Sequence, residues 1–359
     1  MPNRSPSDVI KPEVRGLRAY TLKHVKADVK LDQNENPYEL PTDLKREVVA
    51  RVLARPWGRY PEFVPAAVTS TLSKFTGWPE DGILVGNGSN ELIQAALTVT
   101  LGPGRQIAIP QPTFALYKLM ASTLQADINE ISLNPDNFAF DTDHLIEAAQ
   151  TADVVVLCTP NNPTGTLLEH DAVLAILKNA RGLVLLDEAY HEFSEQTAFP
   201  LLPENPKLVI LRTFSKAMSM AGLRFGYLMA HPEIAREIHK AKLPYNVNIF
   251  TLAAAELVVE KHAILREAIA NLIQERNRVI GELQRRPIVR VFPSRTNFIL
   301  IKTPHPARDV FEALYAQGVL VRDVSTYSLL DRCLRVTIGL PEENDRFLDA
   351  LDRALENRQ

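Results

Sequence analysis

The chain has 359 residues, of which 46% are hydrophobic and 23% are charged. Because one hydrophobic core rarely grows beyond roughly 250 to 300 residues, this length predicts two domains. The formal net charge is -3 and no run of basic residues occurs, so the sequence lacks the electrostatic features of proteins that bind nucleic acid or an anionic membrane. We therefore expect small molecules, or further copies of the chain, as its partners.

Cysteine usage and hydropathy indicate the compartment. The only cysteines are Cys158 and Cys333, which lie far apart in the sequence, and the first residues lack the apolar core of a signal peptide. No stretch approaches the ~20 apolar residues that cross a bilayer. These features predict a protein of the reducing cytoplasm. Cys158 ends an apolar run, so we expect it to pack in the core.

The N-terminal region shows little periodicity. Residues 1–30 are polar and contain three prolines, which predicts an arm that lies on another part of the molecule. The spacing of apolar residues then predicts a helix at 42–54, and a turn follows at Arg-Tyr-Pro, 59–61. On spacing alone, Tyr20 in the arm and Tyr60 in the turn are best explained as surface aromatics.

Between residues 82 and 226, short apolar runs alternate with stretches of helical periodicity. The runs lie at 83–85, 107–109, 154–157, 183–186 and 208–211, and the predicted helices at 90–100, 114–124, 143–150 and 169–180. Continuous apolarity marks strands that are covered on both faces, which predicts a mainly parallel sheet with crossover helices. Ligands bind such sheets at the carboxyl ends of the strands, so the residues after each run are candidates for a site.

The first run is followed by Gly-Asn-Gly-Ser-Asn at 86–90, in which Ser89 is placed to cap the next helix. A helix that starts in this way offers free N–H groups and a positive dipole end to a phosphate. An ordinary serine-capped helix explains the same pattern. The segment is not a dinucleotide-binding fingerprint, because Leu92 occupies the position of the third glycine.

The second and third runs lead to an aromatic and to a polar turn. Phe114 follows the second run, and its ring could lie against a planar ligand or simply belong to the core. The third run leads to Thr-Pro-Asn-Asn-Pro-Thr-Gly at 159–165, where turn chemistry explains most of the composition. Asn162 is nevertheless well placed for a polar ligand.

The fourth run ends directly at Asp187, within the motif Asp-Glu-Ala-Tyr at 187–190. A carboxylate at this point is expected to be partly buried and to need a cationic or hydrogen-bonding partner. A metal site built from Asp187, Glu188, His191 and Glu192 is an alternative. Their spacing fits neither a zinc-binding helix nor a calcium loop, so we expect no metal.

The fifth run leads to Lys216, which lies between hydroxyl-bearing residues, and Arg224 follows eight positions later. A solvated lysine in a loop is the simplest interpretation of any single lysine. An amine that forms an imine, beside a group that neutralises an anion, is the alternative. Together the five strand ends supply an amine, a carboxylate, an arginine, a helix start, an asparagine and an aromatic ring. A phosphorylated pyridine aldehyde needs this set, which predicts pyridoxal 5'-phosphate (PLP) as the cofactor.

These motifs resemble those of the fold type I PLP-dependent aminotransferases. The resemblance rests on the segment 213–227, on Asn-Pro-Thr-Gly at 162–165 and on Asp-Glu-Ala-Tyr at 187–190. Within these enzymes the chain is most similar to the histidinol-phosphate aminotransferase branch, through Asn-Glu-Asn-Pro at 34–37, Arg-Tyr-Pro at 59–61 and the segment 334–344. The likeness therefore extends along nearly the whole chain.

The resemblance implies a role for each cofactor-site residue. Lys216 would bond to the cofactor and then carry a proton between the substrate α-carbon and the cofactor, while Asp187 would keep the pyridine nitrogen protonated. Phe114 would stack on the ring. The remaining assignments are Asn162 and Tyr190 to the phenolic oxygen, and Ser89, Asn90, Thr213, Ser215 and Arg224 to the phosphate. Tyr60 would reach the phosphate from a neighbouring subunit, which implies a homodimer with shared active sites.

The C-terminal part is predicted to form a smaller domain. Helical periodicity extends over 252–283, strands are predicted at 289–292, 298–301, 319–322 and 333–338, and a helix at 307–317. Arg322 and Arg335 fall in the last two strands. Exposure to solvent is the usual position of an arginine, but the resemblance places both at the substrate, where guanidinium groups suit a phosphate or carboxylate. Tyr20 and Asn34 complete the predicted substrate-binding set.

The resemblance also implies the overall organisation and the reaction. We expect an α/β fold with a large PLP-binding domain at 33–255, whose mixed, mainly parallel sheet is flanked by helices. An arm at 1–32 and a small α+β domain at 256–359, built with the N-terminal segment, complete the chain; 33–55 could pack on the small domain instead. Glutamate would donate its amine and leave as 2-oxoglutarate, and the ketone imidazole-acetol phosphate would become L-histidinol phosphate, or the reverse.

Three alternatives remain open at this point. Aromatic amino acid aminotransferases and decarboxylases that act on threonine phosphate share most of these motifs. A cofactor-binding sensor domain of a transcription regulator is a non-enzymatic alternative, but the sequence shows no winged-helix segment or basic patch beside the cofactor motifs. A comparison of keto acceptors would distinguish the enzymes.

Overall fold

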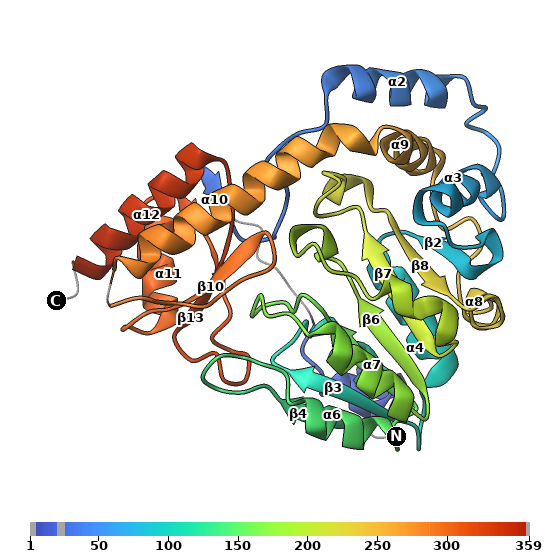
Figure 1. Cartoon of the computed structure of the whole chain (residues 1–359), viewed down its shortest axis with the longest axis horizontal. Coiled ribbons are helices and arrows are strands. Elements are labelled where there is room, and N and C mark those ends of the chain that lie inside the picture. The colour runs from blue at the N-terminus through green and yellow to red at the C-terminus, as the bar shows by residue number, and fades with distance from the viewer. Residues whose placement is uncertain (1–4, 20–25, 287, 357–359) are drawn as a thin grey trace.

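The computed structural model describes residues 5–19, 26–286 and 288–356. These residues form two sheet-containing parts (Figure 1), one around a seven-stranded sheet and one around a four-stranded sheet. The predicted α/β fold with a mixed, mainly parallel sheet and a smaller second part is confirmed. Among the described residues, no helix has the length and apolarity required to cross a membrane.

The seven-stranded sheet has the order β2-β8-β7-β6-β5-β3-β4. Its strands are β2 (Ile83–Gly86), β3 (Gln106–Gln111), β4 (Asp127–Ser132), β5 (Val154–Cys158), β6 (Leu183–Asp187), β7 (Leu208–Thr213) and β8 (Gly226–Ala230). Only β8 runs against the others, because it pairs antiparallel with both β2 and β7. All five predicted strands therefore point the same way, and their carboxyl ends meet at one edge of the sheet.

Strands β4 and β8 were not predicted. In β4 the sequence Asp-Ile-Asn-Glu-Ile-Ser alternates polar and apolar residues, and the strand lies at the edge of the sheet with most of its residues partly exposed or exposed. It therefore lacks the continuous apolar run that marked the inner strands. Strand β8 is entirely buried, but it lies within and just after the motif that was assigned to the cofactor.

Helices cover both faces of this sheet and explain the continuous apolar runs. Successive strand residues point to opposite faces, so Val155 packs in one core while Val154 and Val156 pack in another. The first core also contains residues of α2 (Thr42–Leu53), α3 (Ala66–Thr76), α6 (Thr142–Ala149), α7 (His170–Asn179) and α9 (Ile249–Glu260). The second contains residues of α4 (Ser89–Thr100), α5 (Leu116–Thr123) and α8 (Pro232–His239).

The second part has an antiparallel sheet in the order β12-β13-β10-β9. Its strands are β9 (Arg290–Val291), β10 (Phe298–Lys302), β12 (Arg322–Asp323) and β13 (Cys333–Thr337), and its helices are α10 (Arg266–Gln284), α11 (Ala307–Ala316) and α12 (Pro341–Glu356). The N-terminal segment joins it, because β1 (Val29–Lys30) pairs parallel with β11 (Val319–Leu320). Figure 1 shows α10 leading from the first part into the second.

The helical periodicity at 252–283 belongs to two helices rather than one. Helix α9 ends at Glu260, a short 3-10 helix η6 (His262–Leu265) follows, and α10 begins at Arg266. Helices α3, α8 and α12 were not predicted. The short elements that remain are α1 (Pro12–Arg15), η1 (Pro6–Val9), η2 (Glu80–Gly82), η3 (His191–Phe193), η4 (Phe199–Glu204) and η5 (Ala221–Leu223).

Candidate active site

A cavity of about 340 Å³ lies at the carboxyl edge of the large sheet and collects most of the predicted site residues. Those that line it are Asn34, Ser89, Asn90, Phe114, Asn162, Asp187, Tyr190, Thr213, Ser215, Lys216, Arg224, Arg322 and Arg335. Tyr60 is not among the lining residues, and Tyr20 lies outside the residues that the structure describes. Segments more than 100 positions apart in the sequence thus contribute to one chamber.

Lys216 follows strand β7, and its side chain reaches into this cavity. The amine donates a hydrogen bond to the backbone carbonyl of Gln33, with an N–O distance of 2.8 Å. Burial, reinforced by the positive charge of Arg335, lowers the pKa of Lys216 to about 7. A large fraction of this amine is therefore neutral at physiological pH, which is the form that attacks an aldehyde or removes a proton.

Asp187 is the last residue of β6, and its side chain is buried. Its Oδ2 accepts a hydrogen bond of 2.6 Å from the hydroxyl of Tyr117, and its Oδ1 accepts one of 3.0 Å from the N–H of Ala189. Burial raises the pKa of Asp187 above its ordinary value. Within the described residues this carboxylate has no ion pair, so its position suits a cationic group on a ligand, such as a protonated pyridine nitrogen.

One end of the cavity carries groups that suit a phosphate. Helix α4 starts at Ser89, and Gly88 before it has φ 83 and ψ 161 with no side-chain cap. Ser89 was predicted to cap this helix but forms its first residue instead, so its hydroxyl does not occupy the N–H groups of the first turn. Arg224 donates a hydrogen bond of 3.0 Å to Ser215. The guanidinium group also lies against the start of α4, since a Cβ atom on Gly88 would be 2.5 Å from its Nη2. A helix N-terminus, a guanidinium group and hydroxyls together suit a phosphate.

The hydroxyl of Tyr190 is held in place by a hydrogen bond from Asn34, which is itself bonded to Thr337. The side-chain amide of Asn34 donates to the Tyr190 hydroxyl at 2.9 Å, and its Oδ1 accepts from the Thr337 hydroxyl at 3.1 Å. Asn34 has φ 56, a left-handed conformation that asparagine adopts more readily than most residues. The sequence assigned Asn34 to the substrate, and the structure shows that its amide links Tyr190 to the second sheet.

The two predicted arginines lie side by side on the second sheet. Arg322 of β12 and Arg335 of β13 are direct partners in the antiparallel register. Arg335 donates to Oδ1 of Asn162 at 2.7 Å and to the carbonyl of Asp32 at 2.6 Å. Arg322 makes no ion pair with any residue that the structure describes. Because like charges in opposite positions repel, this pair favours an anion bound beside it.

Tyr60 does not line the cavity of its own chain. Its side chain is 81% exposed and stacks on Tyr245, with ring centroids 4.6 Å apart. Phe63 packs edge-on against the same Tyr245, and Trp57 and Leu243 are exposed as well. This exposed aromatic and apolar group lies apart from the buried cores.

Several lining residues were not assigned from the sequence. They are Asp32, Gln33, Tyr117, Cys158 and Ala189. Tyr117 lies in the first turn of α5, and no local sequence pattern marks it as a site residue. Cys158 is the register partner of Asp187 on the neighbouring strand. Its place in the cavity wall therefore follows from strand pairing, and no sequence motif around Cys158 predicts it.

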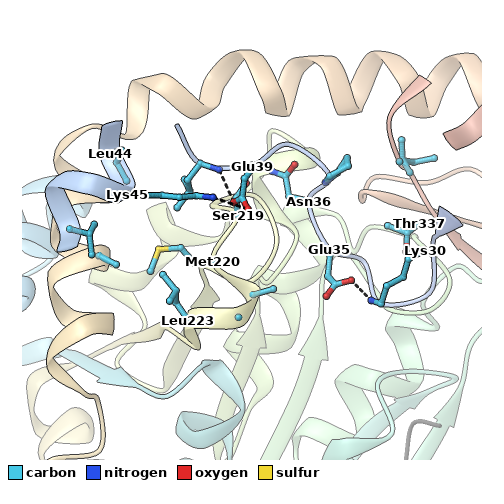
Figure 2. Close-up of a pocket in the computed structure, with 18 of the residues that line it drawn as sticks. Lys30, Glu35, Asn36, Glu39, Leu44, Lys45, Ser219, Met220, Leu223 and Thr337 are labelled. Carbon is cyan, nitrogen blue, oxygen red and sulfur yellow. Dashed lines mark hydrogen bonds and ion pairs between the residues drawn. The ribbon is translucent and has the colours of Figure 1, made fainter. Parts of the chain in front are cut away.

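A larger cavity of about 770 Å³ lies between α2, η5 and the segment that follows β1. Figure 2 shows two ion pairs among its lining residues, Lys45 with Glu39 and Lys30 with Glu35. Much of the remaining lining is apolar, including Leu44. None of the residues predicted for the cofactor lines it, so the smaller cavity is the candidate active site.

Comparisons with known proteins identify the family of the chain. A model of the family "Aminotransferase class I and II" matches residues 26–351. The chain is 42% identical over 346 residues to a histidinol-phosphate aminotransferase of Chlorobium phaeovibrioides, with 95% of this chain and 96% of that protein covered.

Solved structures share the fold. The histidinol-phosphate aminotransferase of Clostridium acetobutylicum is 26% identical and superposes with a TM-score of 0.85, over 92% of this chain and 99% of that chain. A histidinol-phosphate aminotransferase of Sinorhizobium meliloti, solved in complex with pyridoxal-5'-phosphate, is 22% identical and gives a TM-score of 0.84, over 93% of this chain and 92% of that chain. The chain therefore belongs to the class I and II aminotransferases, and within them to the histidinol-phosphate aminotransferases.

Proposed function

We propose that this aminotransferase uses PLP to transfer an amino group between L-histidinol phosphate and 2-oxoglutarate, which become imidazole-acetol phosphate and glutamate. The observation that carries the proposal is a single cavity in which Lys216 and Asp187 accompany two adjacent guanidinium groups, those of Arg322 and Arg335. The substrate assignment is further supported by the full-length relative that bears this name.

The residues fit the cofactor at each of its functional groups. Asp187, a buried carboxylate with two hydrogen-bond donors and no ion pair among the described residues, would hold the pyridine nitrogen in its protonated form. Phe114 would cover the ring, and Asn162 and Tyr190 would bond the phenolic oxygen. The phosphate would be held by Ser89, Asn90, Thr213, Ser215 and Arg224. When bound, the cofactor supplies a covalent anchor for the substrate amine and an electron-withdrawing ring that stabilises negative charge at the α-carbon.

Lys216 is the proposed proton carrier. Burial and the charge of Arg335 lower the pKa of its amine to about 7, which is near the operating pH. General acid–base catalysis is most efficient when the pKa of the catalytic group lies in this range. It would remove the proton from the substrate α-carbon and return a proton to the cofactor carbon on the other side of the amino nitrogen.

Arg322 and Arg335 are the proposed substrate anchors. The same two guanidinium groups would bind the carboxylates of glutamate in one half-reaction and the phosphate of the other substrate in the next. Planar guanidinium forks suit both anions, because each presents oxygen pairs of similar spacing. The hydrogen bonds from Arg335 to Asn162 and to the Asp32 carbonyl hold one of these forks in place.

The proposed assembly is a homodimer in which Tyr60 serves the partner's site. This tyrosine is 81% exposed, does not line its own cavity and forms an aromatic group with Phe63 and Tyr245. Exposed patches of this kind typically mark protein interfaces. The proposed compartment is the cytoplasm, which is supported by two cysteines that are buried and unpaired.

A kinetic comparison of acceptors tests the substrate. The enzyme loaded with glutamate is assayed with imidazole-acetol phosphate and with phenylpyruvate, and we expect the phosphorylated ketone to have the higher kcat/KM. A preference for phenylpyruvate would instead identify an aromatic amino acid aminotransferase. Release of carbon dioxide from threonine phosphate would identify a decarboxylase.

The variant Arg322→Gln tests the anion site directly. Losing one charged hydrogen-bond donor should lower kcat/KM for imidazole-acetol phosphate by roughly 10- to 100-fold, and should change the affinity for PLP less than about twofold. Arg308→Gln is the matched control, because Arg308 is an exposed arginine of α11 that pairs with Glu312 and lies outside the cavity. An unchanged kcat/KM for imidazole-acetol phosphate, or an equal loss of PLP affinity, would contradict the assignment of Arg322.

A further inference from the structure

Tyr117 is a buried tyrosine of α5 that touches the catalytic carboxylate. Its side chain is 0% exposed, and its hydroxyl donates a hydrogen bond of 2.6 Å to Oδ2 of Asp187. Burial raises the pKa of Tyr117 well above the ordinary value for a phenol, and the charge of Asp187 acts in the same direction. The hydroxyl therefore remains a neutral donor throughout the pH range in which the enzyme works.

Two donors fix the orientation of the Asp187 carboxylate. Tyr117 holds Oδ2, and the N–H of Ala189 holds Oδ1 at 3.0 Å. The tyrosine comes from a helix on one face of the sheet and the amide from the loop after β6, so the carboxyl group is held from two independent elements. It lines the cavity, and each oxygen keeps a lone pair for a ligand.

Tyr117 also contacts the residue that is proposed to cover the cofactor ring. Its ring lies edge-on to Phe114, with centroids 5.5 Å apart and an interplanar angle of 85°. One side chain thus contacts both groups that are assigned to the pyridine, the carboxylate at its nitrogen and the ring at its face. A hydrogen bond to the charged form of a carboxylate stabilises that form against the neutral acid.

We propose that Tyr117 is a positioning residue that keeps Asp187 ionised and aligned, so that the nitrogen of a bound pyridine carries the proton. This proposal rests on the proposed PLP-dependent function. Without the phenol, the carboxylate loses one of its two donors, and the proton shared with the pyridine nitrogen moves toward Asp187. The ring then withdraws electrons less well, and the chemical step slows while substrate binding is retained.

The test compares Tyr117→Phe with Tyr227→Phe in the full-length enzyme. Tyr227 is a matched control, because it is also a buried tyrosine whose hydroxyl is hydrogen-bonded, in this case to Arg212 at 3.4 Å, and it does not line the cavity. PLP labelled with ¹⁵N in the ring is bound to each protein. In Tyr117→Phe the nitrogen resonance should shift toward that of a neutral pyridine, and kcat should fall by roughly 10- to 100-fold with KM changed less than about threefold. Tyr227→Phe should leave the resonance at its wild-type position.

A second replacement separates the effect of the lost hydrogen bond from the effect of misfolding. Tyr117→3-fluorotyrosine keeps the ring and the hydroxyl but makes the hydroxyl a stronger donor, so the nitrogen resonance should stay at, or move further toward, the protonated position. An unchanged resonance and kcat in Tyr117→Phe would overturn the positioning role, as would a shift toward neutral pyridine in the fluorinated protein. Failure of the wild-type protein to bind PLP would instead contradict the proposed function, so the two outcomes are distinguishable.

Discussion

At the scale of single residues, burial rather than residue type gives Lys216 its chemistry. An exposed lysine is almost fully protonated at neutral pH, whereas burial and the nearby charge of Arg335 lower the pKa of Lys216 to about 7. Asp187 is affected in the opposite direction, since burial raises its pKa. Both shifts disfavour the charged form, and a positively charged pyridine ring between the two groups would offset the cost at Asp187.

The depressed pKa of Lys216 predicts how the apoprotein captures PLP. Only the neutral amine attacks the aldehyde, so the rate of capture should rise with pH through about 7 and level off above it. The measurement is borohydride trapping of PLP after short incubations between pH 5.5 and 9. Lys216→Ala should show no trapped cofactor and no turnover. A rate that continues to rise steeply up to pH 9 would indicate an ordinary, solvated lysine.

At the scale of elements, the turn between β2 and α4 brings its backbone close to the side chain of Arg224. Gly88 has φ 83 and ψ 161, a region essentially restricted to glycine, and its α-carbon lies against the guanidinium group of Arg224. Gly226 on β8 is equally constrained, because a Cβ atom there would be 2.4 Å from the backbone nitrogen of Ser89. The phosphate end of the site therefore depends on two glycines that bring a helix start, a strand and an arginine together.

Gly88→Ala tests this arrangement. The added methyl group would meet Nη2 of Arg224 at 2.5 Å, so the guanidinium group must move away from the helix start. We expect PLP affinity to fall by about tenfold or more, from loss of a charged contact to the phosphate, and the free energy of unfolding to fall by about 1–3 kcal/mol. Fluorescence titration with PLP and urea unfolding measure the two effects.

Gly77→Ala is the control for that variant. Gly77 also has a positive φ, 79, but nothing lies within 4 Å of a Cβ atom at this position, at the end of α3. This variant should lose about 1 kcal/mol of stability and keep the wild-type affinity for PLP. An equal loss of affinity in both variants would show that general destabilisation, rather than displacement of Arg224, weakens the binding of PLP.

At the scale of the whole molecule, the proposed site draws on both sheet-containing parts of the chain. Residues of both sheets contribute, since Lys216 and Asp187 follow or end strands of the large sheet while Arg322 and Arg335 lie on the small one. Tyr60 lies on the surface of its own chain, with its ring stacked on Tyr245. If Tyr60 serves a second copy, the site is complete only in the dimer.

Mixed dimers test whether Tyr60 acts across the interface. Lys216→Ala and Tyr60→Ala proteins are each prepared, and the two are then mixed under conditions that exchange subunits. One site in each mixed dimer combines an intact Lys216 with the partner's intact tyrosine, so the mixture should recover about a quarter of the wild-type activity. If Tyr60 served its own chain, no site in the mixture would be intact and mixing would give no recovery.

How much of the site could be predicted from the sequence depends on how each residue is placed. Asp187 ends a buried strand and Lys216 follows another, so a run of apolar residues followed by polar residues predicted their positions. Tyr117 lies inside a helix and carries no such signal. Its contact with Asp187 spans 70 residues and depends on how α5 packs against the ends of β5 and β6.

The sequence alone determined the order of five parallel strands along the chain, although not the edge strand β4, and it determined the group that follows each of the five and hence the class of cofactor. Parallel strands bring their carboxyl ends to the same edge, so residues far apart in the chain meet by a general rule. Only the tertiary structure decided the register that places Arg322 beside Arg335, the link from Asn34 to Tyr190 and the exposure of Tyr60. These contacts arise from antiparallel register and from packing between separate sheets, which no local sequence pattern specifies.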